Sequence, residues 1–214
     1  MPEHAHLSDH IDDLASIYDP AIHLAVARRH PAPSIAAFVT EILARHCLPS
    51  AELMVEPGAS LTDQLPAALG PYAKAVSAVP GFDDFCGDLE LQVAIFSELF
   101  ELDAVGMRIA TLQGPMCPRF HVDHVPCRLI TTYGGQGTEW LPEEYVDRTL
   151  LGAADLPLRH PEAGDGRTCA LDAWAIGLFR GEGWLEGKVG GVVHRSPHIQ
   201  PEQPRLLLTL DFTT

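Results

Sequence analysis

The chain lacks the features that mark the common secreted, membrane-bound and zinc-ribbon classes of protein. Its five cysteines form no CxxC pair, which argues against a disulfide framework and against a structural zinc ribbon. No apolar run reaches the ~18 residues that a membrane span needs. The start of the chain, from Met1 to Asp13, is polar and acidic, without the basic start and apolar stretch of a secretory signal. We therefore expect a cytoplasmic protein that is not inserted in a membrane.

Positive charge is also scarce. Fourteen Lys and Arg residues stand against 29 Asp and Glu residues, which gives a net charge of −15. Such a charge repels phosphate backbones, and no Lys/Arg cluster offsets it. Nucleic acid is therefore not expected as a partner, which leaves a small molecule or a protein as the substrate class.

Hydrophobic periodicity predicts a helical region over residues 1–104, packed on a strand-rich core within one compact domain. Apolar residues recur with helical spacing from Ile35 to Leu43 and again from Phe85 to Phe100. Between them, Leu65 to Val79 keeps a helical period, but Pro66 and Gly70-Pro71 interrupt it, so we expect short broken helices there.

Residues 105–214 have a different pattern, in which short alternating segments are separated by Gly and Pro. The strand candidates are 105–109, 119–123, 127–133, 172–179, 190–194 and 205–212. Short strands at this spacing are typical of a barrel or a jelly roll. The sequence therefore predicts an α+β fold with a β core under an N-terminal helical layer.

The last strand candidate has two different faces. Leu206, Leu208, Leu210 and Phe212 share one face, and Arg205, Leu207, Thr209 and Asp211 share the other. The apolar face is expected to pack under the helices. The mixed face is then expected to line a partly polar cavity that contains Arg205.

A candidate metal site comes from two segments that are far apart in the sequence. His121 and Asp123 are two residues apart, so both side chains point to the same side of a strand. His194 ends another strand candidate. Two imidazoles and one carboxylate on one face of a metal, with the other positions open, form the facial triad of non-haem Fe(II) oxygenases. His121, Asp123 and His194 are therefore predicted metal ligands.

An arginine follows the second histidine at the start of the last strand. The planar guanidinium of Arg205 could hold the distal carboxylate of a 2-oxo acid such as 2-oxoglutarate with two parallel hydrogen bonds. Arg128 and Arg119 are rival anchors for this co-substrate. A surface ion pair of Arg205 with Glu202 or Asp211 is the alternative.

Two further residues are candidates for a catalytic role. Arg119 shares the strand face of His121 and Asp123, so it could contact the substrate. Tyr133 ends the strand candidate at 127–133.

Other residues near the triad leave the type of site open. A fourth ligand from His124, His198 or Cys117 would give a closed zinc site rather than an open iron site. A nucleophile pair of Cys117 or Cys127 with His121 also stays open, although no local signature supports it.

Several blocks of the sequence resemble the bacterial family called domain of unknown function 1826, over a region from about Leu24 to the end of the chain. The blocks are Cys117–Val125, Arg128–Tyr133, Gly137–Pro142, His194–Pro197 and Arg205–Asp211. The resemblance implies no established activity. It does imply an association with zinc-responsive gene neighbourhoods, which keeps a zinc-related role open.

A looser resemblance concerns the order HxD, His, Arg, which is similar to that of the Fe(II)/2-oxoglutarate oxygenases. This likeness implies a double-stranded β-helix core, jelly-roll or cupin-like, with His121, Asp123 and His194 on the metal and Arg205 on 2-oxoglutarate. The chain departs from the pattern by the additional His124 and by its short C-terminus. We expect an Fe(II)- and 2-oxoglutarate-dependent dioxygenase. The alternatives are a non-catalytic zinc-handling protein, a cupin-like metalloenzyme without 2-oxoglutarate and a binding module with packed histidines.

Overall fold

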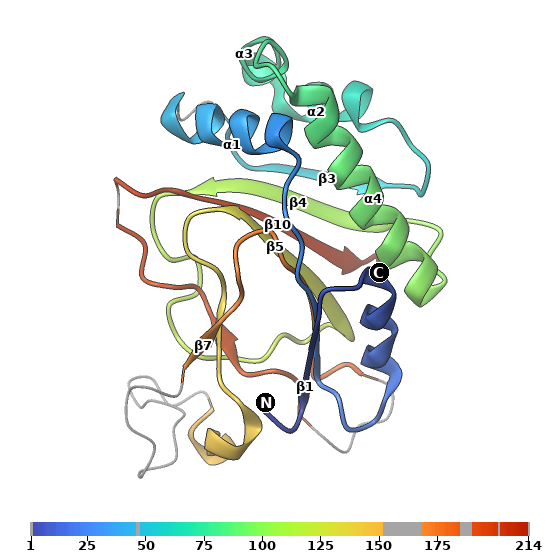
Figure 1. The fold of residues 1–214 in the computed structure, drawn as a ribbon, viewed down its shortest axis with the longest axis vertical. Coiled ribbons are helices and arrows are strands. Elements are labelled where there is room, and N and C mark those ends of the chain that lie inside the picture. Colours follow the sequence, from blue (N-terminus) through green and yellow to red (C-terminus); the bar gives the residue numbers. More distant parts are fainter. Residues whose placement is uncertain (1, 46–47, 152–167, 185–189, 201, 214) are drawn as a thin grey trace.

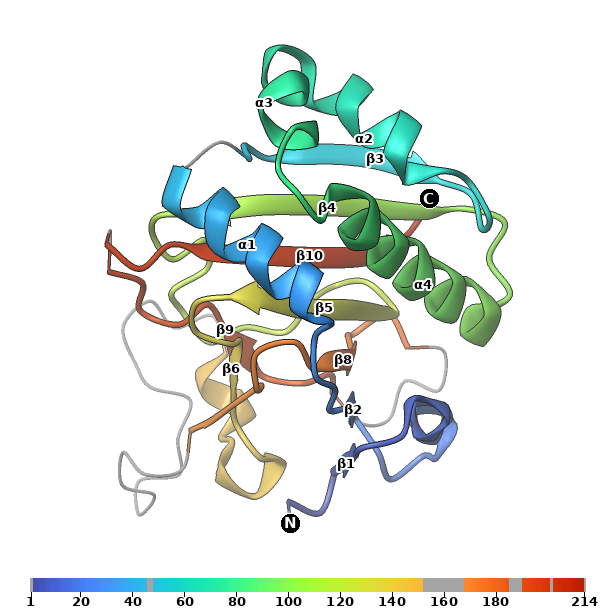
Figure 2. The same cartoon turned by 45° about the horizontal axis from the view of Figure 1, so that its top comes forward.

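The computed structural model describes residues 2–45, 48–151, 168–184, 190–200 and 202–213. A large, twisted β-sheet forms the middle of the molecule, helices cover one of its faces, and a small second sheet lies on the other face (Figures 1 and 2). Within the described residues, none of the helices combines the length and the apolar character that crossing a membrane requires.

Helices and short strands are mixed in the first part of the chain, and strands predominate in the second part. The first part contains β1 (Ala5–Ser8), the 3-10 helix η1 (Ile11–Tyr18), β2 (Leu24–Ala27), α1 (Pro33–Arg45), β3 (Ala51–Val55), α2 (Leu61–Leu69), η2 (Gly70–Tyr72), α3 (Ala73–Ser77) and α4 (Phe82–Phe100). The second part contains β4 (Val105–Leu112), β5 (Cys127–Gly134), β6 (Glu139–Trp140), η3 (Glu143–Tyr145), η4 (Arg148–Leu150), β7 (Cys169–Ala170), β8 (Ile176–Arg180), β9 (His194–Arg195) and β10 (Arg205–Phe212).

The strand order identifies the core as a double-stranded β-helix. The large sheet has the order β1-β2-β8-β5-β10-β4-β3, and the small sheet has the order β7-β6-β9, to which His121 adds one antiparallel bridge with His194. From β4 onwards the chain passes back and forth between the sheets, so that β4, β5, β8 and β10 lie in the large one and the His121 segment, β6, β7 and β9 in the small one. Two facing sheets connected in this way form a jelly roll, which confirms the predicted fold.

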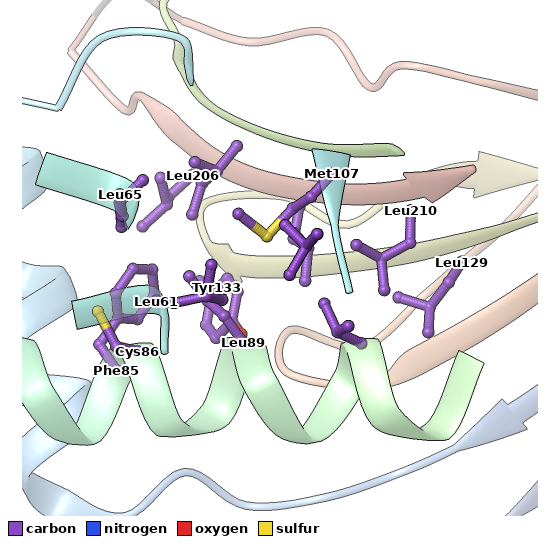
Figure 3. Close-up of a cluster of buried hydrophobic side chains, with 14 of the residues drawn as sticks. Leu61, Leu65, Phe85, Cys86, Leu89, Met107, Leu129, Tyr133, Leu206 and Leu210 are labelled. Carbon is purple, nitrogen blue, oxygen red and sulfur yellow. The ribbon is translucent and has the colours of Figure 1, made fainter. Parts of the chain in front are cut away.

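The main hydrophobic core lies between the large sheet and the helices. Apolar side chains of α1, α2 and α4 meet those of β4, β5 and β10 (Figure 3). Leu206, Leu208 and Leu210 are fully buried in this core, as the alternation in the last strand predicts. The opposite face of β10 therefore looks toward the small sheet.

A second hydrophobic cluster fills part of the space between the two sheets. It includes Ile130 and Leu207 of the large sheet and Trp140 of the small sheet. Burial of these side chains holds the sheets together, and the polar residues of the same strand faces are left to line a pocket beside this cluster.

Pro66 does not interrupt a helix, contrary to the sequence-based expectation. α2 runs through Pro66, because Leu61, Leu65 and Leu69 are spaced one turn apart and are all buried in the main core. The interruption expected at Gly70-Pro71 is confirmed, because α2 ends at Leu69 and is followed by the short helices η2 and α3. Gly70 has a backbone φ of 54°, in a region that favours glycine.

The strands also differ in part from the expected segments. Residues 119–123 form no continuous strand and pair only through the bridge at His121. Of 172–179, only the part from Ile176 onwards pairs, as β8, and 190–194 contributes only His194 to β9. Residues 1–104 supply three unpredicted strands, β1, β2 and β3, to the large sheet.

Candidate metal centre

The two histidines of the predicted triad are brought together by backbone pairing. The amide of His121 donates to the carbonyl of His194 at 3.0 Å, and the amide of His194 donates to the carbonyl of His121 at 2.9 Å. The imidazole rings consequently lie side by side, with their centroids 4.5 Å apart. Asp123 joins them, and one potential ligand atom of each residue lies within 4.8 Å of the other two. Among the described residues, this is the one cluster of three or more such side chains.

Hydrogen bonds on the far side of each ring orient the histidines. Nδ1 of His121 lies 3.0 Å from the carbonyl oxygen of Arg119, and Nδ1 of His194 lies 3.0 Å from that of Val192. A carbonyl only accepts, so both bonds place the proton on Nδ1 and leave a lone pair on Nε2. These Nε2 atoms lie 3.7 Å and 3.4 Å from the carboxylate of Asp123, for His121 and His194 respectively. Such hydrogen bonds to the outer ring nitrogen are typical of metal-binding histidines.

The Asp123 carboxylate is satisfied on one side only. Its Oδ1 forms an ion pair with Nη1 of Arg128 at 2.8 Å. Its Oδ2 is buried, has no hydrogen-bond partner and lies 3.4 Å from Nε2 of His194, whereas Nε2 of His121 lies 3.7 Å from Oδ1. A buried charged oxygen without a partner is costly, and a cation between Oδ2 and the imidazoles would remove that cost. The donor set of two nitrogens and one oxygen fits Fe(II) or Zn(II).

His194 is held in the neutral form that metal binding needs. Burial lowers its pKa to about 4, and the neighbouring charge of Asp123 offsets this effect only in part. The side chain is 6% exposed, whereas that of His121 is 33% exposed. The cluster therefore opens toward solvent on the side of His121.

Arg205 lines the same pocket as the two histidines of the triad. Its guanidinium is buried and donates to Oγ1 of Thr132 at 2.8 Å and to Oγ1 of Thr138 at 2.6 Å. Within the described ranges, no carboxylate pairs with it, so neither Glu202 nor Asp211 is its partner. Burial alone lowers its pKa to about 10, and the group stays cationic at neutral pH. A buried cation without a counter-charge is a site for an anionic ligand.

The pocket that connects these groups has a volume of about 120 Å³. His121 and His194 lie on its wall, and Arg205, Thr138 and Thr209 also line it. The volume is of the same order as cavities that hold a small organic molecule. The arrangement can therefore hold a cation and a small anion side by side.

The three possible additional ligands lie outside the cluster. His124 is 90% exposed and pairs with Glu182 at 2.8 Å. His198 is exposed, and Cys117 lines the pocket without joining the cluster. The described residues thus give three ligands, which leaves positions on a bound ion open.

Tyr133 is on the wrong face of the sheet for a catalytic role. It is buried in the core under the helices, where its hydroxyl donates to Asp88 at 2.5 Å and accepts from Gln92 at 2.6 Å. Cys127 faces the same core, which removes it as a nucleophile partner of His121. Arg128, on the pocket face, uses its donors on Asp123 and Asp211. Arg119 has an exposed side chain, and only its carbonyl contacts the site.

Sequence reasoning missed the two threonines that hold Arg205, and the pairing of Asp211 with Arg128. Thr132 is in the same strand as Arg128 and on the same face, so strand alternation could have placed it near the pocket. Thr138 lies in a loop, where no periodicity reports its direction.

The family model described as "Protein of unknown function (DUF1826)" matches residues 8–211. Among curated proteins, no relative matches this chain.

Several solved structures are similar in outline. The rice dioxygenase for auxin oxidation shares 13% identity over 98% of this chain and 82% of its own, with a TM-score of 0.49. A Pseudomonas putida prolyl-4-hydroxylase shares 14% identity over 95% of this chain and 99% of its own, with a TM-score of 0.47. The Arabidopsis thaliana dioxygenase for auxin oxidation 1, in a complex with 2-oxoglutarate, shares 10% identity over 97% of this chain and 91% of its own, with a TM-score of 0.49. Because these scores lie below 0.5, the fold assignment rests on the strand order.

Proposed function

The chain belongs to the DUF1826 family of proteins of unknown function, and from the geometry of its metal centre we propose that it is an Fe(II)- and 2-oxoglutarate-dependent dioxygenase. The observation that carries the proposal is that two buried charged groups near one pocket, one anionic and one cationic, each lack a partner. Asp123 Oδ2 is a buried carboxylate oxygen without a partner beside the imidazole of His194, and Arg205 is a buried cation without a carboxylate. A metal ion would bind to the first group, and an anionic co-substrate would form an ion pair with the second.

The ligand set supports iron over a closed zinc site. His121, Asp123 and His194 form a three-ligand cluster on one side of the pocket, and His124 and His198 point elsewhere or lie outside it. Three protein ligands leave room for a bidentate 2-oxo acid and for O2. When bound, the iron would supply O2 activation and oxidation of a C–H bond of the substrate.

The protein residues then have separate tasks. The hydrogen bonds from Nδ1 of His121 and His194 to backbone carbonyls keep both Nε2 lone pairs directed at the ion. Thr132 and Thr138 hold the Arg205 guanidinium, which would bind the distal carboxylate of 2-oxoglutarate as a fork. Burial of Arg205 excludes water from this contact and strengthens it.

An anaerobic titration tests the proposal. Protein purified without affinity metals is loaded with Fe(II), and 2-oxoglutarate is then added; we expect a weak visible charge-transfer band that saturates at one equivalent. Protein that binds iron but shows no band, and no 2-oxoglutarate binding by calorimetry, would overturn the dioxygenase assignment. Elemental analysis of the protein as isolated distinguishes an iron enzyme from a zinc-handling protein.

A further inference from the structure

A chain of two carboxylates and one guanidinium runs from the metal centre into the large sheet. Asp123 precedes β5, Arg128 lies near the start of β5, and Asp211 lies near the end of the neighbouring strand β10. We propose that Arg128 and Asp211 are positioning residues that force Asp123 to bind the metal through one oxygen. The inference rests on the proposed metal site, but it holds for iron and zinc alike.

The geometry assigns a different partner to each oxygen of Asp123. Nη1 of Arg128 holds Oδ1 at 2.8 Å, and Oδ1 also lies 3.7 Å from His121 Nε2, whereas Oδ2 has no hydrogen-bond partner and lies 3.4 Å from His194 Nε2. Arg128 is itself fixed from behind, because its Nε and Nη2 donate to the two oxygens of Asp211 at 2.6 Å and 3.0 Å. This fork permits one orientation of the guanidinium plane and therefore one orientation of the Asp123 carboxylate.

The consequence concerns the open positions on the ion. A carboxylate with two free oxygens can bind a metal through both and occupy an additional coordination position. With Oδ1 held by Arg128, Oδ2 would be the oxygen that binds an ion, and the additional position would stay available for co-substrate or O2.

Arg128 and Asp211 do not need this ion pair in order to satisfy their own hydrogen-bonding groups. Their side chains are 26% and 28% exposed, so each could be hydrated instead of paired. A second ion pair of the same pocket gives the comparison: Arg195 pairs with Glu139 at 2.6 Å with exposures of 32% and 24%, next in sequence to His194. It matches the Arg128–Asp211 pair in length and burial but does not contact a predicted ligand.

The experiment uses Co(II) alone as the probe, because its visible spectrum reports coordination number. Four forms of the full chain are titrated: wild type, Arg128→Lys, Asp211→Asn and the control Glu139→Gln. Arg128→Lys keeps the positive charge and loses the fork, so its effect reports orientation and not charge. Thermal melting of each metal-free form checks that it is folded, and Asp211→Asn serves as the second test if Arg128→Lys does not fold.

We expect Arg128→Lys and Asp211→Asn to bind Co(II) about 10–100-fold more weakly, the range typical for loss of a group that orients a ligand. Their Co(II) spectra should shift in position and intensity, while Glu139→Gln matches wild type in both respects. Wild-type affinity and spectrum in both variants would overturn the inference and leave the proposed function intact. An equal loss of Co(II) affinity in Glu139→Gln would also overturn the inference, because any ion pair near the pocket would then have the same effect. Failure of wild type to bind Co(II), Fe(II) or Zn(II) would overturn both proposals.

Discussion

Asp123 Oδ2 lies 3.4 Å from His194 Nε2, although the two residues come from segments far apart in the sequence, which the bridge between His121 and His194 helps to bring together. Because the proposed metal site takes ligands from both segments, substitution on either side should abolish metal binding.

We expect Asp123→Ala and His194→Ala to lower the metal content of purified protein to background, measured by elemental analysis. The control is His124→Ala, which removes an exposed histidine that pairs with Glu182 outside the cluster. Its metal content should equal that of wild type. A stoichiometric metal in His194→Ala, or its loss in His124→Ala, would show that the ion is held by a different ligand set.

Arg205 should determine affinity for 2-oxoglutarate without affecting the metal. Arg205→Lys keeps a charge but loses the planar fork, so we expect 2-oxoglutarate to bind more weakly by about tenfold or more, with the iron content unchanged. Calorimetry on iron-loaded protein measures the affinity for 2-oxoglutarate, and elemental analysis measures the iron content. The control is Arg119→Gln, which changes an exposed side chain and should leave both quantities as in wild type. Equal affinity of Arg205→Lys and wild type would exclude Arg205 as the carboxylate anchor.

Alternation along the strands carries most of what the sequence predicts about this fold. In β10, the change between apolar and mixed residues correctly places Leu206 in the helix-facing core and Arg205 in the pocket. The same alternation applied to β5 separates Arg128 from Tyr133, because the two positions differ by an odd number of residues and so face opposite sides. The role expected for Tyr133 is therefore wrong for a reason that is visible in the sequence.

The remaining errors come from segments too short or too uniform to show a period. β2 is buried at all four positions, Leu24–Ala27, so it shows no alternation between buried and exposed residues. β9 has two residues, and its pairing is determined by its neighbours in the small sheet. The spacing of His121 and Asp123 predicts that both side chains point to the same side. It does not predict that His121 pairs with His194, because that pairing depends on the tertiary fold and not on local periodicity.

Tyr133→Phe should weaken the fold and leave the site intact. The change removes a hydroxyl that donates to Asp88 and accepts from Gln92 in the buried core. Asp88 and Gln92 keep their bonds to Arg29, Thr131 and each other, but two buried hydrogen bonds are lost, one of them to a carboxylate. We therefore expect the free energy of unfolding to fall by about 1–3 kcal/mol in urea denaturation. Affinities for iron and 2-oxoglutarate in Tyr133→Phe should stay as in wild type below the unfolding transition. A loss of 2-oxoglutarate affinity in fully folded Tyr133→Phe would show that Tyr133 contributes to the site.

His23 should make the metal-free protein less stable in mild acid. Its ring is 4% exposed, its Nε2 has no hydrogen-bond partner, and it stacks on His4 with the ring centroids 4.6 Å apart. Burial, followed by the neighbouring His4, lowers its pKa from 6.5 to about 4. Above pH 6.5 the ring is neutral in both the folded and the unfolded chain, and it contributes no pH dependence.

As the pH falls below 6.5, the unfolded chain binds a proton that the folded chain does not, so the free energy of unfolding decreases until the pH passes about 4. The total loss from this group is at most about 3.5 kcal/mol, at ~1.4 kcal/mol for each unit of pKa. Urea denaturation between pH 7 and pH 4 should therefore show a shallower decline in His23→Phe, which keeps an aromatic ring that cannot titrate, than in wild type. Because His194 also has a lowered pKa and is unchanged in the variant, only the difference between the two curves belongs to His23. Parallel curves over this range would mean that the folded protein takes up the proton at His23 as readily as the unfolded chain does.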